Sequence, residues 1–158
     1  MKKLFAIVLS FALLMSLSVT AFAAEIKQDT VPNTNDADIT TSIAPTYTVT
    51  IPADVNVAFN ATETAFGAIE VTASQIHPDK CIKVALATDK ELNNAIDNTK
   101  VIPYAIKDSE GTAFTSATYL TEGDKTELSI HITADDWNAA YAGDYSDTVT
   151  FTVSYEDK

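Results

Sequence analysis

The constraint that most limits the fold of this chain is a run of strict alternation near its C-terminal end. From Tyr145 onward, apolar side chains occupy every second position apart from Asp147, with serine and threonine between them: Val149, Phe151, Val153 and Tyr155. Successive side chains of a β-strand point to opposite faces. The pattern therefore predicts one long strand over residues 145–155, with one face buried and the other in water.

The same period of two recurs along the chain. It is found in the sets Tyr47/Val49/Ile51, Val55/Val57/Phe59, Ile69/Val71/Ala73, Ile82/Val84/Leu86, Ile102/Tyr104/Ile106 and Leu128/Ile130/Ile132. Pro45, Pro52 and Pro103 lie in or beside these runs, and because proline cannot donate to a ladder, we expect edge strands there. About seven to nine short strands with almost no helix predict an all-β fold, an antiparallel Greek-key, immunoglobulin-like β-sandwich with one or two short helical turns.

Two segments carry signals for the start of a helix. Thr133 is placed as an N-cap with Asp136 three residues later, and Trp137 and Tyr141 are four residues apart, so both can lie on one side of a short helix. The segment Thr88–Glu91 resembles a capping box as well. There a short helix and a loop with a short strand are both compatible with the residues that follow.

The N-terminus has the organisation of a secretory signal peptide. Lys2 and Lys3 precede an apolar stretch that ends at the small-residue site Ala21-Phe22-Ala23. This pattern predicts residues 1–23 as a signal peptide and a secreted, extracellular or cell-surface location. No second apolar run follows, so we expect no membrane association after the signal is removed.

The rest of the chain divides into an arm and a domain. Residues 24–44 are polar and acidic, which predicts a flexible N-terminal arm, and residues 45–158 form the expected β-sandwich domain. Within the arm, Ile39, Thr41 and Ile43 alternate weakly. Part of the arm could therefore become a strand when it meets a partner.

The charge of the chain excludes one class of partner. Without the two lysines of the signal peptide, eight of the ten basic residues remain against 22 acids, so the formal charge changes from −12 to −14. Such a chain is repelled by phosphate backbones, and nucleic acid is excluded as a partner. The charge itself favours solubility of an exported protein.

No residues are arranged in a pattern that indicates catalysis. Cys81 is the single cysteine and cannot form an internal disulfide, and it shares a strand face with Lys83, so we expect it to be partly exposed. His77 and His131 belong to no protease signature, and His131 is expected to point outward. Because nucleophile-elbow, zinc-protease and phosphate-loop motifs are also missing from the sequence, we expect no enzyme, no catalytic residues and no cofactor.

Two groups of residues are candidates for ligand binding. The acids Asp135, Asp136, Asp144 and Asp147 could hold calcium through oxygen ligands, but their spacing matches no EF-hand loop, and helix capping with surface charge is the alternative. We expect no metal site, and these four acids are weak candidates for one.

The aromatic residues form the second group. Trp137, Tyr141 and Tyr119 could form a platform for sugar rings, since aromatic rings combine an apolar face with a polar edge. Alternatively, Trp137 closes the end of the sandwich.

Two segments also carry a resemblance to known families. Residues 133–154 (TADDWNAAYAGDYSDTVTFTVS) and 47–55 (YTVTIPADV) resemble the closing and opening segments of immunoglobulin-like surface domains exported by Firmicutes. The pattern A-G-x-Y-x-D-x-V-x-F-x-V is similar to the end of spore-coat-U-type and pilin-like subunits. Cell-wall-binding WxL domains end in a related way, although Phe151-Thr152-Val153 stands where they have Trp-x-Leu. The resemblance implies that Tyr145 is a Greek-key corner tyrosine tied to nearby backbone, and that Gly143 serves the turn before it.

Together these features favour a secreted, non-enzymatic subunit with a structural or adhesin-like role at the cell surface or in an extracellular matrix. Its expected mechanism is association through strand edges, with itself or with other surface proteins, because unpaired backbone groups accept an added strand. In this hypothesis residues 24–44 are the donor. The alternative is a module that binds carbohydrate or the cell wall.

Overall fold

The computed structural model of the chain describes residues 26–29, 31 and 34–158. The expected signal peptide lies outside these residues. The chain divides into two units, residues 1–41 and residues 42–158. In the first unit, every described residue is exposed and none belongs to a helix or strand. All strands of the described chain therefore belong to the second unit.

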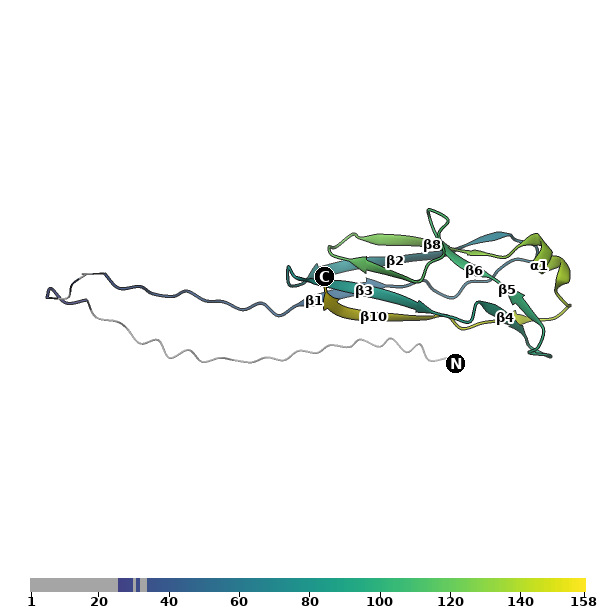
Figure 1. Cartoon of the computed structure of the whole chain (residues 1–158), viewed down its shortest axis with the longest axis horizontal. Helices are drawn as coiled ribbons and strands as arrows, with labels where there is room; N and C mark the ends of the chain where they lie inside the picture. The colour runs from purple at the N-terminus through teal and green to yellow at the C-terminus, as the bar shows by residue number, and fades with distance from the viewer. Residues whose placement is uncertain (1–25, 30, 32–33) are drawn as a thin grey trace, which may run out of the picture. The chain divides into compact units, whose positions relative to one another are not determined.

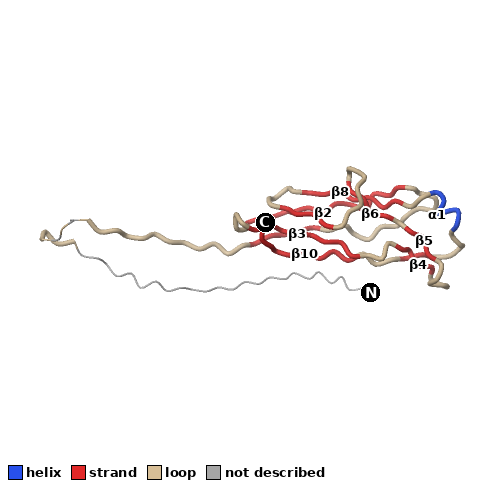
Figure 2. Tube along the Cα trace, viewed as in Figure 1, coloured by secondary structure: helices blue, strands red, loops and turns tan. Residues whose placement is uncertain are grey.

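The second unit is an all-β, antiparallel, sandwich-like domain, as the alternation predicts (Figures 1 and 2). Its sheets have the strand orders β1-β2-β8-β6, β10-β3-β7 and β5-β4-β9. One short helix, α1, spans Ala134–Ala139. The strands are β1 Thr46–Thr50, β2 Glu63–Gln75, β3 Lys80–Ala87, β4 Glu91–Asn94, β5 Val101–Pro103, β6 Ala105–Asp108, β7 Ser116–Tyr119, β8 Lys125–His131, β9 Tyr145–Ser146 and β10 Thr150–Asp157.

The core lies between the two larger sheets, and Figure 1 shows β2 and β8 in one layer with β3 and β10 in the other. The side chains that are fully inaccessible are contributed by both layers: Ile69 and Val71 from β2, and Ile82 and Val84 from β3. The inward positions predicted on β8 are confirmed, because Leu128 is 3% and Ile130 8% exposed. The buried faces of alternating strands thus form one continuous apolar interior.

One lateral side of the sandwich is closed by the chain itself. The loop between β6 and β7 crosses from one layer to the other, and its Phe114 is buried. The Phe114 backbone N–H donates to the carbonyl oxygen of Ile106 at 2.9 Å, and the Leu86 N–H donates to the carbonyl oxygen of Thr115 at 2.8 Å. This loop therefore seals β6 to the layer that holds β3 and β7.

The opposite side has no such crossing segment. Here β1 and β10 are edge strands, each paired with a single neighbour. At one end the Tyr47 and Tyr155 rings approach to 5.9 Å between centroids. Val153, on the core-facing side of β10, stays 37% exposed. This side of the sandwich is therefore covered only by side chains, and only in part.

The predicted long strand over residues 145–155 is wrong in its continuity. It is divided into β9, which pairs with β4, and β10, which pairs with β3. The break falls at Asp147, the polar residue on the apolar face. Its carboxylate accepts hydrogen bonds from the side chains of Thr88 and Tyr104 and from the Thr148 backbone N–H, so the chain turns there instead of continuing a ladder.

Two further expectations are decided by the structure. Residues 88–94 form a loop and the strand β4 rather than a helix, since Thr88 Oγ1 and Asp89 Oδ1 accept from backbone N–H groups two residues on. The expected exposure of Cys81 is wrong, because its side chain is buried. The end of β10 runs beside it, and Sγ lies 3.7 Å from the carbonyl oxygen of Asp157.

We predict that Ile82→Ala lowers the free energy of unfolding by about 2–5 kcal/mol, since it leaves a cavity between the layers. Urea denaturation followed by tryptophan fluorescence measures the change. The control Thr118→Ala, at an exposed position of the neighbouring strand β7, should shift the value by no more than about 0.5 kcal/mol. Equal effects for both variants would contradict a core at Ile82.

Candidate functional site

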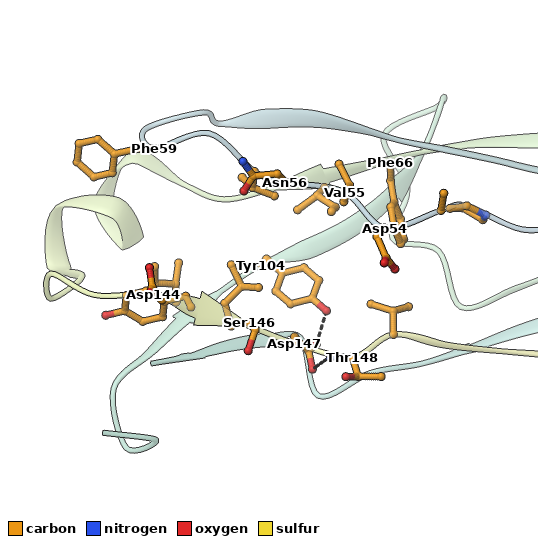
Figure 3. A pocket seen from close by; sticks show the side chains of 18 of the residues that line it. Asp54, Val55, Asn56, Phe59, Phe66, Tyr104, Asp144, Ser146, Asp147 and Thr148 are labelled. Atoms are coloured by element: carbon orange, nitrogen blue, oxygen red, sulfur yellow. Dashed lines mark hydrogen bonds between the residues drawn. The ribbon is translucent and has the colours of Figure 1, made fainter. Parts of the chain in front are cut away.

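The domain has a groove on the side that the chain leaves unsealed (Figure 3). One wall is the segment 51–59, and the other is the segment 143–151. Core residues Ile102, Tyr104 and Ile130 contribute to its lining, and its volume is about 700 Å³. We call this feature the open groove. It leads from the surface to the apolar interior between the layers.

The first wall is extended chain without a partner strand. The alternation at Val55, Val57 and Phe59 predicts a strand, but Ala53–Val57 belong to no ladder and exchange no backbone hydrogen bond with any described residue. Val55 is 38% and Phe59 78% exposed. The prediction of a strand here is therefore wrong, because the segment is extended but does not pair with a neighbouring strand.

Pro52 begins this unpaired stretch. A Cβ added at Gly67 would lie 3.5 Å from the Cβ of Pro52. Gly67 has a φ of +119° and lies at an irregularity in the β2–β8 register. Proline cannot donate to a ladder, and a bulge bends the strand that carries it. Both features end the β1–β2 pairing, so the chain leaves the sheet and forms the wall of the groove.

The second wall is held in place by Asp147. One of its carboxylate oxygens accepts hydrogen bonds from Tyr104, on the floor of the open groove, and from Thr88 Oγ1 at 2.8 Å. Burial, together with this hydrogen bond to Asp147, raises the pKa of the Tyr104 phenol above its ordinary value of 10.0. The groove therefore has a neutral phenol at its base, fixed by a carboxylate.

Tyr145 and Gly143 shape the turn that leads into this wall. The Tyr145 hydroxyl donates to the carbonyl oxygen of Tyr141 at 3.0 Å, which confirms the expected tie to nearby backbone. Gly143 has a φ of +147°, and a Cβ there would lie 2.6 Å from Nδ2 of Asn94. Only glycine fits both the backbone conformation and the space.

Aromatic side chains gather at one end of the open groove. The rings of Phe59 and Trp137 meet edge to face at 5.6 Å between centroids. The Trp137 indole N–H donates to the carbonyl oxygen of Ala61 at 2.8 Å, and its ring packs against the core. Tyr141 is 64% exposed and has Lys100 Nζ 5.0 Å from its ring centroid. Trp137 thus closes the end of the sandwich, while Phe59 and Tyr141 are largely exposed to solvent.

The structure brings together only part of the predicted aromatic platform. Trp137 and Tyr141 line the same shallow hollow, together with Phe59. Tyr119, by contrast, is 3% exposed in the core, and its hydroxyl bonds to Thr126 Oγ1 at 2.9 Å. Burial raises the pKa of Tyr119. Its ring is therefore part of the interior and absent from the surface near Trp137.

The four weak metal candidates have separate positions. Asp135 and Asp136 lie in the first turn of α1, where the Asp136 N–H donates to Thr133 Oγ1 as the capping pattern predicts. Asp144 and Asp147 line the open groove. Across the described residues, no three acidic, histidine or cysteine side chains converge as metal ligands.

Comparison with known proteins gives no family for this chain. No family model matches it, and no curated protein matches it significantly. Within the described part of the chain, no helix has the length and apolar character needed to span a membrane. The function must therefore be argued from the site itself.

The open groove was not predicted from the sequence. The signal nearest to it is the segment from Ile51 to Phe59, which contains Pro52 and Asp54 in its first half and alternates as a strand from Val55 onward. Which strands lack a neighbour depends on sheet order, and local alternation carries no information on that order.

We predict that the Tyr104 phenol makes stability depend on pH above 10. Its folded-state pKa is raised, so the folded protein holds this proton more tightly than the unfolded chain. The contribution is complete below the ordinary pKa of 10.0 and declines as pH rises through the higher folded-state value. The free energy of unfolding should therefore fall with pH above 10, and less steeply in Tyr104→Phe. Identical slopes for the two proteins would show that the pKa of the phenol is not raised in the folded protein.

Proposed function

We propose that this chain is a secreted, non-enzymatic building block of a surface or extracellular assembly, and that its copies associate through strand edges. The observation that carries the proposal is the open groove, with its unpaired first wall and the free edge of β10 beside its second wall. An extended segment with free backbone groups next to an exposed apolar interior is the kind of surface that accepts an added strand.

The N-terminal arm is the donor in this proposal. Ile39 is 99% and Ile43 62% exposed, with Thr41 between them, so the arm offers one apolar face at strand spacing. As long as these two isoleucine side chains remain in water, they contribute no hydrophobic stabilisation. Burial of each isoleucine against a partner would contribute about 1.5–3 kcal/mol.

The expected export agrees with this role. A protein that assembles outside the cell needs a signal peptide and a soluble exported form, and the high negative charge keeps single copies apart until specific contacts form. Most of the residues that line the groove are apolar, which suits a binding surface.

Deleting residues 24–44 tests the arm directly. We expect the chain that begins at Ala24 to form multimers in light scattering and the shortened chain to be monomeric at equal concentration. Circular dichroism must show the same β spectrum for both. Unchanged assembly of the shortened chain would reject the arm as donor.

A second candidate function is binding of carbohydrate or cell wall, supported by the exposed rings of Phe59 and Tyr141 beside Trp137. Exposed aromatic faces suit the apolar faces of sugar rings. In this case Tyr141→Ala should reduce retention on insoluble glycan about tenfold, in line with the loss of about 1–2 kcal/mol for one stacking ring.

The matched control for this test is Tyr47→Ala, which removes an exposed tyrosine that pairs with Tyr155 away from the hollow. Retention that is equal for Tyr141→Ala and the unchanged chain, or that falls equally in both variants, would count against a glycan site near Trp137.

A further inference from the structure

The free edge of β10 continues the second wall of the open groove, and it determines where an added strand can bind. β10 pairs with β3 on one side and has no neighbour on the other. Its core-facing side chains along this edge are only partly covered: Phe151 is half-buried and Val153 is 37% exposed. A strand placed here would pair with β10 and cover these side chains in one step.

We propose that the occupant of this edge is residues 37–45 of a second copy, running antiparallel to β10. The inference rests on the proposed function and adds the acceptor, the direction and the register. It places Ile39 opposite Val153 in β10 and Ile43 opposite Val149, the residue just before β10 begins. Both pairs are four residues apart, so one register satisfies both.

Side-chain size matches this direction. The open groove is lined by residues 143–149 and Phe151, whereas the Tyr47 and Tyr155 rings meet towards the other end of β10. In the antiparallel register, Ile43 faces the groove beside Val149, and Ala37 faces Tyr155. The reverse direction would place Ala37 at the groove and Pro45 against the tyrosine rings, which fills the groove less completely.

Pairing type and length agree as well. Antiparallel ladders are slightly more stable per residue than parallel ones. Residues 37–45 have the same length as the wall 51–59, nine residues that extend over about 26 Å. The added strand would also run parallel to the unpaired stretch Ala53–Val57, whose free backbone groups it would then reach.

The direction also decides which copy supplies the strand. In this register, Pro45 of the added strand lies beside Asp147 of the acceptor. In every copy, however, Pro45 directly precedes Thr46, the first residue of β1, next to Tyr47 and thus near Tyr155 of the same copy. The two places are eight residues apart along the strand, about 26 Å. One peptide unit spans only about 3.8 Å, so a chain cannot fill its own groove in this direction. The donor must be another molecule.

A head-to-tail chain of copies follows from this geometry. Each domain accepts a strand whose donor lies beyond the Asp147 end, and its own arm leaves from the Tyr155 end. Such a heterologous contact does not close on itself and produces an open filament. The opposite direction would place two domains at the same end and allow a closed, reciprocal pair.

Cysteine cross-linking in the chain beginning at Ala24, with Cys81→Ala, tests the register. The double variants Ile39→Cys/Val153→Cys and Ile43→Cys/Val149→Cys should form disulfides on mild oxidation, because opposed Cβ atoms lie about 4.5–5.5 Å apart. They should appear as a ladder of multimers on a non-reducing gel. The swapped pairs, Ile39→Cys/Val149→Cys and Ile43→Cys/Val153→Cys, are the matched controls and should yield at least tenfold less product.

A second variant set makes the test independent of oxidation. Ile39→Glu should weaken self-association at least tenfold in light scattering at about 0.15 M salt, since it places a charge against Val153. Thr40→Glu, on the other face of the same arm, should change it less than twofold.

Each other result overturns a defined part of the inference. Preferred cross-linking of the swapped pairs would overturn the direction, and disulfides within a monomer would overturn the second copy as donor. Multimers in light scattering without cross-links in any pair would overturn β10 as the acceptor but leave the proposed function standing. A chain that stays monomeric at all concentrations would overturn both.

Discussion

The domain depends on burial of one face of each antiparallel strand between two layers. Ile69 and Val71 from one sheet and Ile82 and Val84 from the other are completely removed from water, whereas Glu70 and Lys83 between them are partly exposed. A sheet buries one face only if a second layer covers it. The two layers in turn leave two lateral sides, and how each is closed determines what the protein can bind.

The two sides are closed differently. On one, the loop between β6 and β7 seals the layers with Phe114 and with backbone hydrogen bonds to both sheets. On the other, the edge strands β1 and β10 meet only through side chains, and Ala53–Val57 are extended without pairing. Edge strands of soluble proteins are normally short, covered or charged. An apolar edge that lacks a neighbour is therefore best explained by a segment that covers it.

The sequence predicted the layers better than the site. Period-two alternation identified the inward positions such as Leu128 and Ile130, because burial selects side chains locally. It failed at Asp147, where hydrogen bonds from Tyr104 and Thr88 override the strand pattern, and at Cys81, which the C-terminal strand covers. These contacts join segments more than 40 residues apart, so no local pattern could indicate them. The aromatic candidates show the same limit, since Tyr119 lies in the core, away from Trp137.

Hydrogen–deuterium exchange tests most directly whether the groove is an incomplete sheet that a second copy completes. In dilute solution, the account predicts rapid exchange at Ala53–Val57 and in the arm, with strong protection at Ile82 and Val84. At high concentration, residues 37–45 and 53–57 should gain protection together, while Phe114 is unchanged. Protection of Ala53–Val57 in the dilute monomer, or no joint gain on concentration, would contradict it.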